Sequence, residues 1–118
     1  ALAKMVPLTF ALCDALQRES ISVELIDPRT ISPLDTATIL QSVAKTGRLL
    51  IVEETPAAFG LGAEIAAQIA DAGFNDLDAP IKRVNGAFAP TPYAPSLEAA
   101  VVPSENDVAQ AIRELVRE

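Results

Sequence analysis

The most constraining feature of the sequence is an unbroken apolar run at residues 49–52, which lies between Arg48 and Glu53. A short apolar run between charged residues is typical of a strand covered on both faces, as in a parallel sheet. Segments before and after it carry apolar residues at helical spacing. The sequence therefore predicts strands alternating with helices, which is the pattern of an α/β fold.

The other expected elements follow from the same periodicities and from turn residues. We expect strands at 21–26, 48–53 and 81–84, helices at 7–18, 35–45 and 61–72, and a last helix after Ser104. The first three residues read as the end of a strand whose beginning is missing. The proline-punctuated segment 85–103 is expected to be extended and to wrap a surface, with Phe88 and Tyr93 as its apolar anchors.

Composition narrows the class of protein. The 118 residues are enough for one domain, and half of them are apolar. A net charge of −7 argues against a nucleic-acid surface, and the absence of histidine argues against His-based triads and zinc sites. The single cysteine, Cys13, cannot form an internal disulfide and fits a reducing compartment. No apolar run is long enough to suggest a membrane span.

A rigid corner is expected between the strand at 21–26 and the helix at 35–45. Two prolines there fix the backbone, and Asp35 is placed to cap the helix. The planar guanidinium of Arg29 could clamp a carboxylate across the turn, with Asp27, Asp35 and Glu53 as the candidates. The structural corner of the predicted site is therefore Asp27, Arg29 and Asp35, with a role in architecture rather than chemistry as the plainer interpretation.

The second loop at the carboxyl edge covers residues 53–62. Its candidate residues are Glu53, Glu54, Gly60 and Gly62. Two glycines spaced in this way can bring the backbone close to a ligand or another chain, but the pattern lacks the third glycine of a dinucleotide loop. Neighbouring residues on a strand point to opposite faces, so we expect one of the two glutamates to be buried and the other exposed.

Three phrases of the sequence, in this order, resemble one family. They are Asp-Pro-Arg-Thr-Ile-Ser-Pro-Leu-Asp at 27–35, Gly-Leu-Gly-Ala-Glu-Ile at 60–65, and Ala-Pro-Ile-Lys-Arg-Val at 79–84 followed by Pro-Tyr-Ala-Pro-Ser-Leu-Glu at 92–98. The chain resembles the C-terminal domain of the beta subunit of thiamine-diphosphate-dependent 2-oxoacid dehydrogenases, such as pyruvate, branched-chain 2-oxoacid and acetoin dehydrogenases. The resemblance covers residues 4–118, and the wider class is the transketolase C-terminal domain.

The resemblance implies a three-layer α/β/α domain with a mostly parallel sheet. Relative to that family, residues 1–118 form a single domain that is truncated at its N-terminus. The first edge strand and most of a central strand are missing from the chain. In an intact sheet a central strand is hydrogen-bonded on both sides, so its loss leaves two unpaired edges.

The function implied by the resemblance is that of an assembly and partner-docking domain, inactive alone, whose parent enzyme is an oxidoreductase. Thiamine diphosphate and Mg²⁺ would bind in other parts of that parent, so no catalytic, cofactor-binding or metal residue is assigned here. Two alternatives stay open. One is a free-standing small-ligand module that uses loop 53–62, and the other is the C-terminal domain of a transketolase or deoxyxylulose-phosphate synthase.

The resemblance also implies partners and a location. We expect a homodimer, together with contacts to an alpha subunit and to the basic subunit-binding domain of an acyltransferase. The candidate docking residues are Asp76, Asp78 and Glu118. The expected location is the cytoplasm, or the mitochondrial matrix in a eukaryote.

Overall fold

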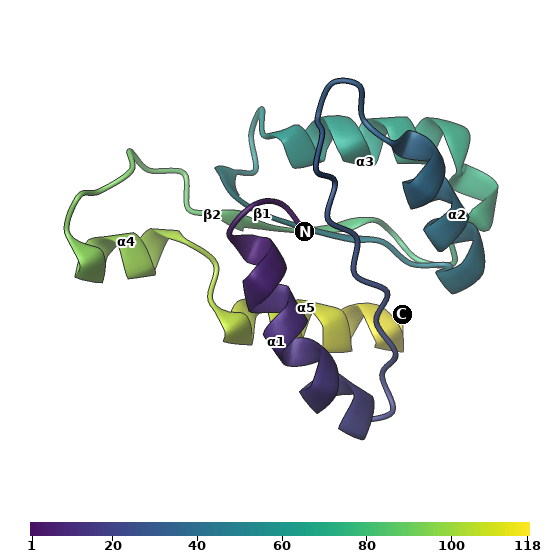
Figure 1. Ribbon diagram of the computed structural model, residues 1–118, viewed down its shortest axis with the longest axis horizontal. Coiled ribbons are helices and arrows are strands. Elements are labelled where there is room, and N and C mark those ends of the chain that lie inside the picture. Colours follow the sequence, from purple (N-terminus) through teal and green to yellow (C-terminus); the bar gives the residue numbers. More distant parts are fainter.

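The computed structural model describes all residues 1–118 and has three layers (Figure 1). Helices α2 and α3 cover one face of a small sheet, and α1 and α5 cover the other, while α4 stands apart on an arm. The elements in chain order are α1 (Met5–Arg18), α2 (Thr36–Thr46), β1 (Leu50–Pro56), α3 (Leu61–Ala72), η1 (Phe74–Asp76), β2 (Lys82–Gly86), α4 (Pro95–Val101) and α5 (Glu105–Arg117). None of the helices combines the length and apolar character needed to cross a lipid bilayer.

The sheet consists of β1 and β2, which pair in parallel. Leu50 lies opposite Lys82 and Val52 lies opposite Val84, with an irregularity in the pairing between Val52 and Pro56. The outer strand β2 begins with Lys82 and Arg83, and charged residues on an edge strand oppose pairing with other chains. The other edge of β1 has no neighbouring strand.

Strand β1 divides the interior into two apolar cores because its side chains alternate between the two faces of the sheet. Val52 packs into the first core with residues of α1 and α5, and Ile51 packs into the second with residues of α2 and α3. The first core contains Met5, Leu16, Val52, Val108 and Ile112, and the second contains Ile39, Val43, Ile51, Ile65 and Ile69.

The predicted strand at 21–26 is wrong for this chain, because these residues form a coil. Burial along the segment still alternates as in a strand: Ile21, Val23 and Leu25 are half-buried and the residues between them are exposed. No N–H group of residues 22–26 donates to another group of the chain. A strand needs a hydrogen-bonding neighbour, and only Ala1 and Leu2 occupy the space between this segment and β1.

The expectation for the proline-punctuated segment is wrong in two respects. It contains helix α4, whose first residue is Pro95, a position that proline suits because its missing N–H has no partner in the first turn of a helix. Phe88 and Tyr93 do not anchor the segment either, since their side chains are 83% and 103% exposed. The arm is instead closed at its base, where the N–H of Ala87 donates to the carbonyl of Val101 at 2.8 Å.

The local signals for helix ends agree with the structure. Asp35 caps α2 by accepting hydrogen bonds from the N–H of Thr38 at 3.0 Å and from its hydroxyl at 2.6 Å. Gly47 ends that helix with φ of 69°, a left-handed conformation that favours glycine. At the start of α5, Ser104 and Asp107 form the reciprocal hydrogen bonds of a capping box.

The capping box gives a testable prediction on stability. Ser104→Ala removes the acceptor of the Asp107 N–H and should reduce the free energy of unfolding by about 1 kcal/mol. Hydrogen bonds from Ser104 lower the pKa of Asp107 below its ordinary value, so this stabilisation is present near neutral pH and is lost as pH falls through the folded-state pKa. Urea denaturation at pH 7 and below pH 4 measures both effects.

The matched control is Ser96→Ala in the first turn of α4, which has no side-chain cap bond. This exposed substitution should change the free energy of unfolding by less than about 0.5 kcal/mol. Equal losses for the two variants at pH 7 would contradict the prediction, as would a Ser104→Ala loss that does not depend on pH.

Candidate functional site

The carboxyl end of β1 carries a buried carboxylate, Glu53, whose side chain is 1% exposed. Its Oε1 atom accepts hydrogen bonds from the N–H of Gly62 at 3.0 Å and from Nδ2 of Asn85 at 2.8 Å. Glu54 is half-buried, with its carboxylate 4.0 Å from Nζ of Lys4. The two glutamates therefore differ in burial, as expected for neighbours on a strand.

The two glycines of loop 53–62 make room for Glu53. A Cβ atom at Gly60 would lie 2.7 Å from Oε1 of Glu53, and one at Gly62 would lie 2.5 Å from the same atom. Gly60 and Gly62 flank the start of α3, where free N–H groups and the helix dipole favour a negative charge. The charge that occupies this position is the chain's own carboxylate, so the loop holds Glu53 where an external anion would otherwise bind.

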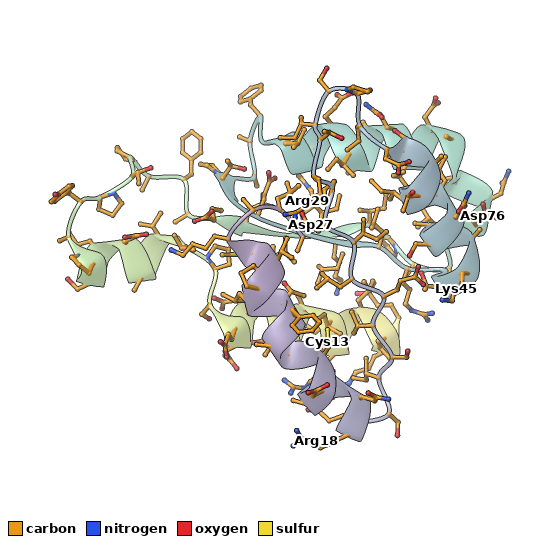
Figure 2. All side chains as sticks on the ribbon, viewed as in Figure 1. Cys13, Arg18, Asp27, Arg29, Lys45 and Asp76 are labelled. Carbon is orange, nitrogen blue, oxygen red and sulfur yellow. The ribbon has the colours of Figure 1, made fainter.

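The proline corner is an exposed turn. Arg29 pairs with Asp27 at 3.3 Å, and its side chain is 86% exposed (Figure 2). Of the three expected partners, Asp35 is engaged in capping α2 and Glu53 is engaged with Gly62 and Asn85. An ion pair this exposed contributes little to stability, because water screens it.

The acidic docking candidates lie at the opposite, amino edge of the sheet. The N–H of Asp78 donates to the carbonyl of Gly47 at 2.8 Å, and its side chain remains exposed, as does that of Asp76 on η1 (Figure 2). Glu118 instead pairs with Nζ of Lys82 at 2.6 Å and raises the pKa of that amine. The structure thus gives Asp76 and Asp78 free carboxylates and gives Glu118 an internal partner.

An exposed apolar surface was missed in the sequence because its residues had been expected to anchor a wrapping segment. The side chains of Phe59, Phe88, Tyr93 and Leu97 are all more than half exposed. Phe59 also has a left-handed backbone with φ of 60°, an uncommon and strained conformation for an aromatic residue. Exposed aromatic side chains on loops and on a projecting arm are typical of a surface that contacts another protein.

No catalytic constellation is assembled by these residues. The thiol of Cys13 is half-buried and donates to the carbonyl of Thr9 one turn earlier in α1. No group of three or more acidic or cysteine side chains is placed to hold a metal ion. With Glu53 seated at the start of α3, the residues present do not fit thiamine diphosphate with its Mg²⁺.

The environment of Glu53 predicts a large effect of its removal. Glu53→Ala leaves the N–H of Gly62 and the amide of Asn85 without their acceptor, and should lower the free energy of unfolding by about 1–3 kcal/mol. The control is Glu54→Ala, whose half-exposed side chain and 4.0 Å ion pair predict a loss below about 1 kcal/mol. Denaturant unfolding compares the two, and a larger loss for Glu54→Ala would contradict the assignment of Glu53.

Comparison with known proteins places this geometry in a family. Residues 1–108 match the family described as "Transketolase, C-terminal domain". The chain is 44% identical over 113 residues to "Pyruvate dehydrogenase E1 component subunit beta-2, mitochondrial" of Oryza sativa subsp. japonica, which covers 96% of this chain and 30% of the relative. It is 46% identical over 110 residues to "Pyruvate dehydrogenase E1 component subunit beta" of Rickettsia felis, with 93% of this chain and 34% of the relative covered.

A yeast relative agrees with these two. "Pyruvate dehydrogenase E1 component subunit beta, mitochondrial" of Saccharomyces cerevisiae is 45% identical over 105 residues, which cover 87% of this chain and 29% of the relative. The chain thus spans about a third of the length of the curated relatives it matches. The resemblance found in the sequence and the predicted fold class are confirmed: the chain belongs to the transketolase C-terminal domain family.

Proposed function

We propose that this chain is the assembly and partner-docking domain of the beta subunit of a thiamine-dependent 2-oxoacid dehydrogenase. The observation that carries the proposal is its identity of 44–46% to pyruvate dehydrogenase E1 beta subunits over almost its whole length. The parent complex would oxidatively decarboxylate a 2-oxoacid, and the chain alone would have no activity. Thiamine diphosphate and Mg²⁺ would bind outside these residues, in the cytoplasm of a bacterium or in the mitochondrial matrix.

The surface chemistry supports a docking role. Phe88, Tyr93 and Leu97 are exposed on the arm that carries α4, and Phe59 is exposed at the carboxyl edge of the sheet. Aromatic side chains are enriched in protein interfaces, where burial removes their apolar area from water. We assign this apolar surface to contacts with a second copy of the chain and with the alpha subunit.

The acidic surface supports a second docking contact with different chemistry. Asp76 and Asp78 are exposed at the amino edge of the sheet, and the chain has a net charge of −7. Such a surface complements a basic partner and attracts it before contact. We assign it to the basic subunit-binding domain of the acyltransferase, with Glu118 contributing less because Lys82 already neutralises it.

The two alternative functions have less support. A small-ligand site at loop 53–62 would need space at the start of α3, and Glu53 occupies that space. A transketolase or deoxyxylulose-phosphate synthase domain would share the family, but the relatives with 44–46% identity bear the names of pyruvate dehydrogenase beta subunits. Both observations favour the dehydrogenase.

Docking of the acyltransferase domain tests the proposed function. In the beta subunit, replacing Asp76→Asn and Asp78→Asn together should weaken binding of that basic domain by about tenfold, and binding to the unchanged subunit should weaken as salt rises. Isothermal titration calorimetry at several salt concentrations measures both. Asp14→Asn, on an exposed position of α1, is the matched control and should leave the affinity unchanged. Equal affinity of the double variant and the control would contradict this docking site.

The assembly role predicts that the chain forms a homodimer. Light scattering should find twice the 12.4 kDa mass of the chain, with the dimer fraction rising as concentration rises. Replacing Phe88→Ser and Tyr93→Ser together should shift the equilibrium to monomer, because it removes exposed apolar area from the arm. Phe10→Ser, a substitution of an exposed aromatic residue on α1, serves as the control. A mass of 12.4 kDa at every concentration would overturn this prediction.

A further inference from the structure

The principal cavity of the chain lies between the coil at 21–26 and strand β1. Its volume is about 190 Å³, and 15 of the 22 residues that line it are apolar. The coil supplies residues 21–26 to its wall, and residues 49–52 supply the opposite side. In Figure 1 the coil crosses the strands at a steep angle instead of running alongside them.

The backbone groups on both sides of this cavity lack partners. Strand β1 pairs with β2 along one edge only, and the N–H groups of residues 22–26 make no hydrogen bond within the chain. The hydroxyl of Thr9, which also lines the cavity, is the one buried side-chain polar atom of the chain without a partner. Buried backbone and hydroxyl groups are normally paired, so an occupant with its own donors and acceptors fits this space better than an apolar molecule does.

The first two residues set the position and direction of such an occupant. The N–H of Leu2 donates to the carbonyl of Val52 at 2.9 Å, and the Ala1 amine donates to the carbonyl of Ile26 at 3.0 Å. From Ala1 to the start of α1 the chain runs toward the end where β1 finishes (Figure 1). A segment joined to the amino side of Ala1 would therefore run back along β1 toward Leu50, parallel to it, through the cavity.

The side-chain pattern of that segment can also be derived. Ala1 packs against the first core and Leu2 packs against the second. Because strand side chains alternate, the residue joined to Ala1 would face the second core and the one before it would face the first. Both faces of the segment would be covered by helices, and a strand of this kind carries apolar residues throughout.

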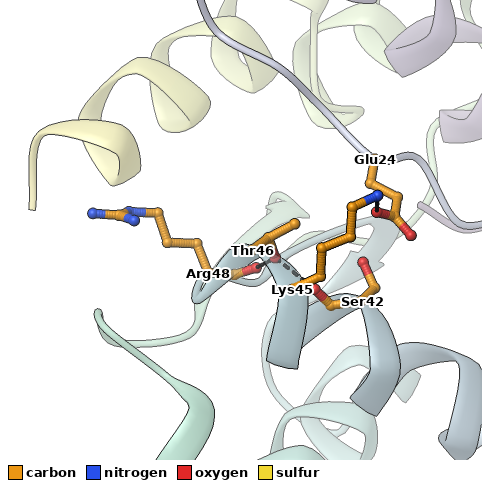
Figure 3. A network of polar contacts seen from close by, with 5 residues as sticks. All are labelled: Glu24, Ser42, Lys45, Thr46 and Arg48. Carbon is orange, nitrogen blue, oxygen red and sulfur yellow. Dashed lines mark hydrogen bonds and ion pairs between the residues drawn. The ribbon is translucent and has the colours of Figure 1, made fainter.

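The polar end of the cavity marks where the segment would enter. Figure 3 shows Lys45 paired with Glu24 at 2.7 Å, and the Thr46 hydroxyl donating to the carbonyl of Ser42 at 2.8 Å. These four residues and Arg48 contribute to the contacts that join the coil and α2 beside the cavity. The apolar part lies deeper, beside β1, so the chain could pass from water into the cavity at this end.

We propose that this cavity is the acceptor site for an extended apolar segment of about five residues joined to Ala1, which lies parallel to β1 as a third strand. The coil at 21–26 then turns alongside it and becomes a fourth strand, with its N–H groups paired. A peptide N–H at Ala1 would make the bond to Ile26 without a charge, whereas burial lowers the pKa of the amine now at that atom despite nearby Asp27.

The test compares three N-terminal extensions of the chain. Val-Ile-Val-Ile-Val should fill the cavity, Gly-Ser-Gly-Ser-Gly is the flexible control, and Val-Pro-Val-Pro-Val keeps apolar residues but removes backbone donors. With the first extension, amide hydrogen exchange should slow at least about tenfold for residues 22–26, and the unfolding midpoint should rise. The two controls should leave both unchanged, and Leu2→Pro should abolish the gain by removing the bond to Val52.

Three outcomes would overturn the proposal. The first is equal exchange rates and unfolding midpoints for the three extensions. The second is an equal gain with the proline extension, which would mean that apolar burial alone fills the cavity. The third is a gain that occurs only in a dimer by light scattering, which would make a second copy of the chain the occupant.

Discussion

The rest of the structure depends on the burial of strand β1 between two helical layers. Ile51 and Val52 point to opposite faces and enter separate cores, so one strand joins α2 and α3 to α1 and α5. Apolar area buried in this way contributes about 25 cal/mol per Å² to folding, and here it is divided over both faces of one short strand. The pairing with β2 satisfies one edge of β1, and the other edge faces the cavity. This is a partial sheet, in which covering of the faces is more complete than pairing of the edges.

The same strand positions the charged residue at its carboxyl end. Glu53 follows Val52, so its side chain points to the face on which α3 begins, where the N–H of Gly62 reaches it. The two glycines that resemble a ligand-binding loop in the sequence therefore serve an internal contact. Function then rests on the surfaces around the sheet, which separate into an apolar arm and an acidic edge.

Sequence reasoning identified the elements that local chemistry determines. Asp35, Gly47 and Ser104 with Asp107 mark helix ends through bonds within three or four residues, and the helix at 61–72 has the bounds of α3. The strand at 21–26 could not be predicted in the same way, because its hydrogen bonds require a neighbour that is distant in the sequence. Helix α4 was hidden by surrounding prolines, although Pro95 is a favourable first residue. The role of Glu53 was open for a similar reason, since Asn85 approaches it only through the fold.

The closed base of the arm has an evolutionary consequence. One backbone bond between Ala87 and Val101 joins the two ends of the arm, and neither core includes Phe88, Tyr93 or Leu97. Substitutions at such exposed positions change the stability of a domain little, so folding imposes weak selection on them. Selection at these positions comes from the partners that they contact. Related chains can therefore diverge in the proteins they recognise while the two cores remain the same.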